Sequence, residues 1–439
     1  MVDLRGKRLL ILGGSRISIE IVKKAKEKGI YTIVTDWYDM ESSPAKEIAD
    51  KAYQVSTTDM DGLLDLIKRE NIEGILTGYT DSTLPYYAQI CELSGLPCYG
   101  SKELFDVFTE KNSYKKLLSD FDVPVVDNYT FTKDEMLSTQ VDVKYPVLVK
   151  PSDSSGGRGV SICRNHEELI KGYEKAEANS ETNSVLVERF IEGEEVTLFF
   201  LFNNGEVHLS GIGNRHIKKN QGEDTIALPV AYTFPSYVIP SYVEKTYPKM
   251  KKMLESVNIQ NGMMFAQCLI EDNECVVYDI GYRLTGSLEY KIQKEVCGYD
   301  PLAMMIDFAF TGDMFANTGI AIDAISPYWN AYGFNLTFLI DVEKEITDIS
   351  GISNILNHHS VTDATLAHVE GEIVPISSKG TLKQICLRVF GKTESEFELK
   401  KSLQEIYELF DVKDSDGISM KLEGLDVDEI NGKLVNLND

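Results

Sequence analysis

The sequence has none of the features that mark secreted or membrane-spanning proteins, and it is poor in positive charge. Its 7 cysteines are an odd number without a C-x-x-C pair, which predicts reduced thiols in a cytoplasmic protein. No apolar run approaches the roughly 18 residues that a membrane span needs, and the residues after Met1 predict no signal peptide. The formal net charge of -25 argues against binding to nucleic acid or to an anionic membrane, because both require a local excess of Lys and Arg.

The first 110 residues alternate between strand and helix patterns. Strands are predicted at 8–12, 31–35 and 74–77, and helices at 17–28, 60–70 and 84–94. This alternation predicts a parallel sheet with helices on both faces. Gly13-Gly14-Ser15 follows the first strand, but its spacing is not G-x-G-x-x-G, so we interpret it as a tight strand-to-helix turn rather than an NAD site.

From about residue 111 the pattern changes to interleaved helices and strands, an α+β arrangement. Helices are predicted at 111–121 and 242–256, and strands at 185–191, 195–202, 207–212, 264–270 and 275–280. A further block from about residue 326 contains predicted strands at 335–340, 365–368 and 380–390 and a helix at 395–410. It ends in Asp414-Ser-Asp-Gly417, a poor match to a calcium loop that we interpret as a solvated turn.

The segment 147–162 joins two β-branched runs through a loop rich in Ser and Gly. Lys150 ends the first run, and Gly156, Gly157 and Gly159 lie in the loop. Glycine has no Cβ, so consecutive N–H groups can approach an anion closely, while lysine supplies a point charge. The loop alone fits a phosphate-binding lid and a plain hairpin turn about equally well.

Three further segments favour the phosphate-binding lid. Lys111 opens a helix, Glu188 to Glu195 follows a strand, and Tyr-Asp-Ile-Gly-Tyr-Arg-Leu-Thr-Gly-Ser at 278–287 closes the middle block. Together with Lys150 they supply the cations, carboxylates and oxygens that a nucleoside triphosphate and its magnesium need. In order and spacing, the four segments resemble the ATP-grasp superfamily over nearly the whole chain, in particular the branch with carbamoyl-phosphate synthase, biotin carboxylase and the purine-pathway ligases.

The resemblance implies a mixed α/β and α+β fold of three domains. These are a Rossmann-like domain at 1–110, an ATP-grasp domain of two α+β subdomains at 111–325, and a C-terminal α+β domain at 326–439. A mobile lid subdomain is expected at about 125–190. The length of the chain suits two to four domains.

The resemblance also implies which residues bind ATP. Lys111 and Lys150 match the two phosphate-binding lysines of the family. The other residues implied are Ser154, Ser155, Gly156, Gly157 and Gly159 in the lid, Glu188 near the adenine amino group, Phe190 and Ile191 beside adenine, and Glu195 at the ribose.

The magnesium ligands are where this sequence departs from the family. The metal motif E-x-N-x-R is represented by Asp279, Gly281 and Arg283, and Gln267 takes the ligand position on the preceding strand. Gln267 and Asp279 can bind Mg²⁺, or Mn²⁺ in its place, whereas Gly281 has no side-chain oxygen. Arg283 is expected to hold the transferring phosphoryl group.

The loop at 214–221 corresponds to one that borders the substrate pocket in the family. Arg215 is expected to bind a substrate carboxylate in bidentate fashion, and His216 is interpreted as a surface histidine rather than a general base. His358 and His359 are given no role. The partners implied are a small-molecule carboxylate, an amine and a second copy of the chain in a homodimer.

The function implied is that of an ADP-forming carboxylate-amine ligase. ATP activates a carboxylate as an acylphosphate and an amine then displaces phosphate, with the protein contributing mainly positioning and charge stabilisation. Two alternatives stay open. One is an ATP-dependent carboxylase that uses bicarbonate, and the other is an ATP-binding sensor or scaffold that has lost turnover through Gly281.

Overall fold

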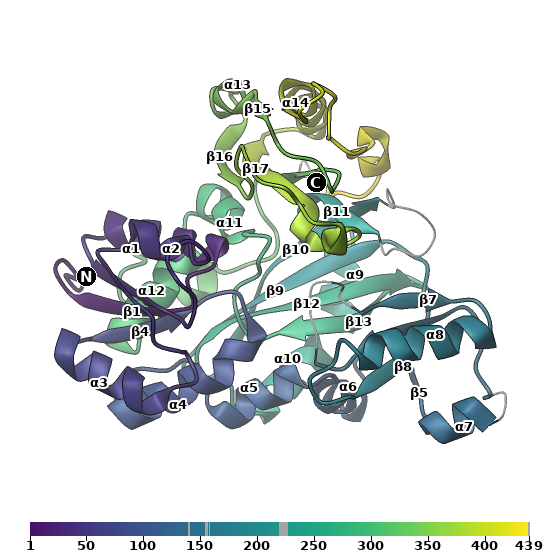
Figure 1. The fold of residues 1–439 in the computed structure, drawn as a ribbon, viewed down its shortest axis with the longest axis horizontal. Helices are drawn as coiled ribbons and strands as arrows, with labels where there is room; N and C mark the ends of the chain where they lie inside the picture. Colours follow the sequence, from purple (N-terminus) through teal and green to yellow (C-terminus); the bar gives the residue numbers. More distant parts are fainter. Residues whose placement is uncertain (139–140, 154–156, 158, 219–226, 438–439) are drawn as a thin grey trace.

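The chain folds around three larger sheets and one two-stranded ribbon, which the computed structural model describes for residues 1–138, 141–153, 157, 159–218 and 227–437. One sheet is parallel and the others are antiparallel. Figure 1 shows the parallel sheet at the N-terminal end, a small sheet at the opposite end, and a long sheet that runs between them to the C-terminal block. The mixed α/β and α+β fold class is thereby confirmed.

The parallel sheet has the strand order β3-β2-β1-β4. Its strands are β1 (Arg8–Leu12), β2 (Tyr31–Thr35), β3 (Lys51–Tyr53) and β4 (Gly74–Thr77), and its helices are α1 (Ile19–Glu27), α2 (Ala45–Ile48), α3 (Met60–Glu70), α4 (Leu84–Ser94) and α5 (Lys102–Thr109). Helix α12 (Pro301–Thr311) also packs here, against β4 and α1. A Cβ on Gly74 would lie only 2.8 Å from the carbonyl oxygen of Ala309, so glycine permits this close approach of helix and strand.

The predicted tight turn after β1 is confirmed. The backbone N–H of Gly14 donates to Asp36 at 2.7 Å, and Asp36 also forms an ion pair with buried Lys46 at 2.6 Å. A Cβ on Gly14 would lie 2.0 Å from the hydroxyl of Ser43. The side chains of Ser43 and Asp36 therefore pack against this turn at Gly14, where a larger residue would clash.

The small antiparallel sheet has the order β5-β8-β6-β7. Its strands are β5 (Asn128–Tyr129), β6 (Val147–Pro151), β7 (Ser161–Cys163) and β8 (Val185–Arg189), accompanied by α7 (Lys133–Ser138) and α8 (His166–Glu177). A separate core cluster that includes Val147, Val149 and Leu169 lies between α8 and the sheet. Such an independent core suits a subdomain that moves as one body, although this motion stays a prediction.

The long antiparallel sheet has eight strands in the order β13-β12-β9-β10-β11-β14-β17-β16. They are β9 (Glu195–Asn203), β10 (Glu206–Lys218), β11 (Leu228–Phe234), β12 (Gly262–Glu271), β13 (Glu274–Gly281), β14 (Tyr332–Leu339), β16 (Val361–Leu366) and β17 (Ile385–Thr393). The sequence predicted a separate C-terminal domain and did not predict β11. Because β11 pairs with both β10 and β14, the strands of that block continue the central sheet.

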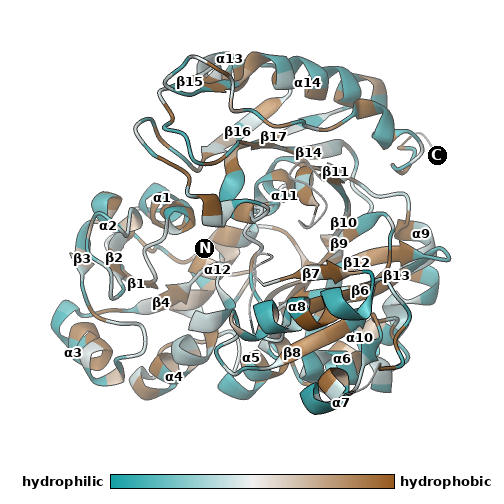
Figure 2. Ribbon diagram, turned by 45° about the vertical axis from the view of Figure 1, so that its right-hand side comes forward, coloured by the Kyte–Doolittle hydropathy of each residue, from teal (hydrophilic) through white to brown (hydrophobic). Residues whose placement is uncertain are grey.

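Helices cover the apolar face of this sheet in two places. Helix α10 (Tyr247–Ser256) lies against β10 and α14 (Glu396–Leu409) against β14 and β17, and Figure 2 shows hydrophobic residues concentrated in the inner strands and polar residues on outer helical surfaces. The predicted single helix at 242–256 is divided into α9 (Ile239–Lys245) and α10, and Pro248 lies in the first turn of the second helix. The other elements are α6 (Lys111–Asp120), α11 (Tyr290–Cys297), α13 (Ile352–Leu356), β15 (Asp348–Ser350) and β18 (Asp411–Lys413).

Three smaller expectations can be compared with the structure. All 7 cysteines are free thiols, as predicted. Within the described ranges, no helix is long and apolar enough to cross a membrane. The turn at Asp414 is present and exposed at 415–417, as predicted, but the Asp414 carboxylate itself is buried, accepts the backbone N–H groups of Asp416 and Ile418, and pairs with Lys344.

We expect Leu403→Ala to lower the free energy of unfolding by about 3 kcal/mol, because removing a buried leucine side chain leaves a cavity. Leu403 is 1% exposed between α14 and the sheet, whereas Phe397 on the same helix is 80% exposed. Phe397→Ala is the matched control and should change stability by less than about 0.5 kcal/mol. Urea unfolding measures both, and equal losses would show that α14 does not pack on the sheet as described.

Candidate active site

One face of the long sheet carries a row of polar side chains. Cross-strand pairing places Glu195 on β9 beside Arg215 on β10, Arg215 beside Tyr232 on β11, and Tyr232 beside Asn335 on β14. Paired residues point to the same side of a sheet, and so do residues two apart on one strand. Thr197, two residues after Glu195, pairs with Gln267, which pairs with Asp279. The predicted metal ligands therefore share a face with Glu195 and Arg215.

Buried lysines lie where the small sheet meets this face. Glu188 on β8 forms ion pairs with Lys150 at 2.8 Å and with Lys115 at 2.6 Å. Lys111 donates to the carbonyl oxygen of Ser152 at 2.9 Å. These four charged residues, Lys111, Lys115, Lys150 and Glu188, are each at most 9% exposed. The structure thus brings the two predicted phosphate-binding lysines, Lys111 and Lys150, together.

The charges in this lysine cluster alter one another's pKa values. Burial opposes ionisation of Glu188, but Lys150 and Lys115 outweigh it and hold the carboxyl pKa below its ordinary value. Burial lowers the pKa of Lys115 to about 8, with Glu188 opposing and Lys150 adding to the effect. Burial likewise lowers the pKa of Lys111. Glu188 thus neutralises excess positive charge, and its contact with adenine stays a prediction.

The glycine loop is only partly described. Ser154, Ser155 and Gly156 lie outside the described residues. Gly157 and Gly159 have φ values of 82° and 73°, a left-handed conformation that glycine adopts without strain. These two positions agree with a loop whose N–H groups turn toward an anion.

The segment predicted to lie beside adenine follows β8. Ile191 is 7% exposed and belongs to a small apolar cluster with Val126 and Val276, while Phe190 is partly buried. This cluster joins the small sheet to β13, since the N–H of Val126 donates to the carbonyl of Val277 at 3.0 Å. An apolar wall of this kind suits the face of a purine base.

Glu195 and Arg215 form an ion pair with each other. Tyr278 donates to the same carboxylate oxygen at 2.9 Å, and the Nε of Arg215 donates to the hydroxyl of Tyr232 at 3.1 Å. A β-bulge between Gln267 and Cys268 leaves Tyr278 without a cross-strand partner and turns its ring toward this network. Burial disfavours the charge on Arg215, yet Glu195 and the tyrosines raise its pKa well above the ordinary value. Arg215 is therefore already engaged, and bidentate binding of a substrate carboxylate stays a prediction.

Arg283 is also engaged, with the N-terminal domain. Its Nε and one terminal nitrogen donate to the two carboxylate oxygens of Asp81 at 2.6 and 2.7 Å, and the other terminal nitrogen donates to the carbonyl of Leu284 at 3.0 Å. Asp81 follows β4, at the carboxyl edge of the parallel sheet. The pair fastens the parallel sheet to the active-site face, and the role of Arg283 toward a phosphoryl group stays a prediction.

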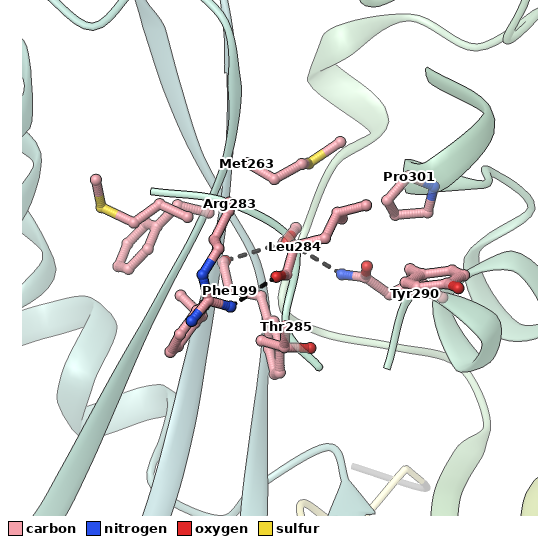
Figure 3. A pocket seen from close by; sticks show the side chains of 12 residues that line it. Phe199, Met263, Arg283, Leu284, Thr285, Tyr290 and Pro301 are labelled. Atoms are coloured by element: carbon pink, nitrogen blue, oxygen red, sulfur yellow. Dashed lines mark hydrogen bonds between the residues drawn. The ribbon is translucent and has the colours of Figure 1, made fainter. Parts of the chain in front are cut away.

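Arg283 lines a pocket on this face, which Figure 3 shows from close by. Phe199 lies next to the arginine, Tyr290 and Pro301 close the other side, and Thr285 lies between them. Inside, Gln293 donates to the hydroxyl of Ser210 at 3.1 Å. The cavity volume there is about 20 Å³, room for roughly one water molecule.

Gly281 is glycine because a ring occupies its side-chain space. Gly281 pairs with Phe265 across the β12–β13 hairpin, and a Cβ on Gly281 would lie 2.5 Å from the phenyl ring. The guanidinium of Arg283 lies over the same ring, 5.1 Å from its centroid. An apolar group thus stands at the position of the family's third metal ligand.

The interpretation of His216 as a surface residue is wrong. Its neighbour Arg215 points to the polar face, so His216 points to the opposite, apolar face, where it is 4% exposed and its Nε2 lies 2.9 Å from the hydroxyl of Thr233. Burial, with a contribution from Lys433, lowers its pKa to about 3. A neutral imidazole on the far side of the sheet does not act as a base at this site.

Four residues of the site were missed in the sequence: Asp81, Lys115, Phe265 and Tyr278. Lys115 could have been found, because it lies one helical turn after Lys111, and Asp81 because ligand sites form at the carboxyl ends of parallel strands. Nothing in the local pattern marks Phe265 or Tyr278, since each depends on a cross-strand neighbour or a bulge.

Comparison with known proteins agrees with this geometry. Residues 110–198 match the family model for the ATP-binding domain of the carbamoyl-phosphate synthase L chain. The formate-dependent phosphoribosylglycinamide formyltransferase of Wolinella succinogenes is 31% identical over 282 residues, which are 63% of this chain and 70% of that protein. The chain belongs to the ATP-grasp superfamily, a family of ATP-dependent ligases and carboxylases. It spans about half, 48% and 52%, of two C-terminal sections of carbamoyl phosphate synthase large chains that it also matches.

Solved structures share the whole fold. The L-amino acid ligase of Bacillus licheniformis superimposes with a TM-score of 0.73 at 17% identity, over 93% of this chain and 98% of that one. The biotin carboxylase domain of Hydrogenobacter thermophilus 2-oxoglutarate carboxylase, solved as a dimer with MgADP and bicarbonate, also gives 0.73 at 17% identity, over 95% and 91% of the two chains. At these identities the likeness establishes the fold.

We expect Glu188→Gln to lower the free energy of unfolding by about 3–5 kcal/mol at pH 7, because two buried ammonium groups lose their counter-charge. The pKa of Lys115, already about 8 in the folded protein, lies below its value of about 10.4 in an unfolded chain. The penalty for its charge is therefore complete below pH 8 and is relieved as the pH rises toward 10.4. Urea unfolding should show a smaller deficit at pH 10 than at pH 7.

Glu192→Gln is the control for this prediction. Glu192 is exposed in the segment after β8, so its replacement should change stability by less than about 0.5 kcal/mol. If Glu188→Gln is as mild as the control, or its deficit is independent of pH, Glu188 does not balance the two lysines.

Proposed function

We propose that this protein is an ADP-forming ligase that activates a carboxylate with ATP and joins it to an amine. The observation that carries the proposal is the meeting of Lys111, Lys150 and Glu188 with the face that bears Gln267 and Asp279. ATP would lie between the small sheet and the long sheet, with its base against the apolar cluster around Ile191 and its phosphates toward the lysines. Glu195, held by Arg215 and Tyr278, would face the ribose.

The lysine cluster suits phosphoryl transfer. A carboxylate oxygen attacks the γ-phosphorus while the bond from that phosphorus to the bridging oxygen of the β-phosphate breaks, which yields an acylphosphate and ADP. The amine nitrogen then attacks the acyl carbon, phosphate leaves with the bond electrons, and the proton lost by the amine passes to phosphate or solvent. Lys111 and Lys150 stabilise the transferring charge from fixed positions, which lowers the barrier without reorganisation.

Gln267 and Asp279 fit one Mg²⁺ or Mn²⁺ ion bound together with nucleotide phosphates. They are cross-strand partners, and Mg²⁺ commonly takes one or two protein oxygens and completes its shell with phosphates and water. Such an ion would supply charge neutralisation on the phosphates. At the position of the family's third ligand, Gly281 carries no side-chain oxygen and the ring of Phe265 fills its side-chain space.

The printed names of the relatives support two versions of this chemistry. A formate-dependent enzyme and an L-amino acid ligase both use a carboxylate, in keeping with the ligase proposal. A carboxylase seen with bicarbonate favours the second candidate, in which bicarbonate is phosphorylated in place of the organic acid. That structure is a dimer, and a homodimer is our proposal for this chain as well.

The test is ADP and phosphate release from ATP and Mg²⁺ with a panel of carboxylates, each with and without amines. We expect release that requires both a carboxylate and an amine. Lys150→Met should reduce it by about 100-fold or more, the usual effect of removing one charge-stabilising group, while Lys171→Met, an exposed lysine on α8, should leave it unchanged. Release with bicarbonate alone would favour the carboxylase, and ATP binding without release from any pair would favour the sensor.

Restoring the family's third ligand requires two changes. Gly281→Asn alone should lower stability by about 1–3 kcal/mol through overpacking against Phe265. Adding Phe265→Leu should relieve the clash, admit the new side-chain oxygen, and lower the half-saturating concentration of Mn²⁺ in ATP binding by about tenfold, or about 1.4 kcal/mol. Calorimetric titration against the Phe265→Leu single variant measures this change. Unchanged metal affinity in the double variant would show that residue 281 does not border the metal position.

A further inference from the structure

Arg388 on β17 is a charged side chain without a direct partner among the residues that the structure describes. It pairs in register with Thr337 on β14 and Thr365 on β16. Its Nε is buried without a hydrogen bond, and the guanidinium makes neither a hydrogen bond nor an ion pair to another described residue. Leaving a buried donor unsatisfied costs about 1–3 kcal/mol, and more for a charged group, so the fold retains this arrangement at the expense of stability.

Arg388 lies on the active-site face. Thr337, its cross-strand partner, is two residues from Asn335, which ends the polar row that begins at Glu195. The charge on Arg388 interacts with Tyr232, Glu289 and Arg215, and burial is the main reason for its lowered pKa. The guanidinium is therefore at the C-terminal end of the row that carries the nucleotide-site residues.

A second incompletely paired group lies close to Arg388. Glu289 precedes α11 and is 1% exposed; one carboxyl oxygen accepts from Thr285, and the other is buried without a hydrogen-bond partner in the described part of the chain. Thr285 also lines the pocket next to Arg283. Arg388 and Glu289, whose charges interact, thus each keep one buried polar atom that no described residue satisfies, a donor on Arg388 and an acceptor on Glu289.

Neighbouring cations do not share this property. Arg215 is neutralised by Glu195, Arg283 by Asp81, and Lys150 by Glu188. An anionic ligand at this end of the face would therefore find one available guanidinium with a carboxyl group nearby. That balance suits a singly charged carboxylate, which guanidinium binds in bidentate geometry, better than a phosphate dianion.

We propose that Arg388 binds a carboxylate that is not activated by ATP, so that the amine substrate is one that carries its own carboxylate, such as an α-amino acid. Glu289 would accept a hydrogen bond from the amine end of the same molecule. This assignment rests on the proposed ligase for its chemistry, but the binding site itself can be tested without turnover.

The test is binding of a panel of small amines to the full chain with MgADP, measured by saturation-transfer NMR and calorimetry. The panel comprises L-amino acids, O-phosphoethanolamine and alkylamines without an acid group. We expect at least one amino acid to bind, Arg388→Met to weaken it at least tenfold, and Arg388→Lys to retain part of the affinity. Lys392→Met, on the same strand, is the control and should bind like the unaltered protein.

Each result has one meaning. Binding of no amino acid, equal binding by Arg388→Met, or preference for O-phosphoethanolamine overturns the proposal. If the methionine variant does not fold in a circular dichroism assay, the lysine variant and the control carry the comparison. If amino acid binding depends on Arg388 but no pair of substrates releases ADP, the ligase proposal is overturned and the binding site stands. If alkylamines support ADP release and Arg388→Met does not change it, the ligase proposal stands and the binding site is overturned.

Discussion

A continuous antiparallel hydrogen-bond ladder from β13 to β16 is the constraint on which the rest of the structure depends. Because each pair of strands fixes the register of the next, side chains contributed by residues 195 to 390 fall on one face in a defined order. Strand β11 is the link, since it pairs with β10 on one side and β14 on the other. Without it the nucleotide residues and Arg388 would belong to separate sheets, and no common site would exist.

Charge balance is the second organising feature. The cations of the site are paired across element boundaries, Glu188 with two lysines, Glu195 with Arg215, and Asp81 with Arg283. Each pair holds together elements that are distant in sequence, and each prevents an uncompensated buried charge. A polyanionic nucleotide entering this region would meet cations that are already positioned, which is the condition for electrostatic stabilisation without reorganisation. Arg388 has no such partner among the described residues, which is the basis for proposing a ligand there.

The departure from the family's metal motif has a steric origin. The residues at 281 and 265 depend on each other. The ring of Phe265 fills the side-chain space of Gly281 and also supports Arg283. Loss of the asparagine therefore does not by itself indicate decay of the site. The surrounding residues are packed and charge-balanced, as expected for a functional site with a different ligand set.

The sequence by itself determined the local elements and predicted the nucleotide site. Strands β1, β2 and β4 and helices α3 and α4 were predicted to the residue, since their hydrophobic periodicity and helix-ending signals are local. Lys111, Lys150, Glu188 and Asp279 were predicted as site residues because the family motifs place them in order along the chain. Features that depend on contacts between elements could not be predicted in the same way. These are the side of the sheet to which His216 points, the ring over Gly281, the pairing of Arg283 with Asp81, and the lack of a described partner for Arg388. These depend on cross-strand register and on contacts between residues tens to hundreds of positions apart, which only the tertiary structure sets.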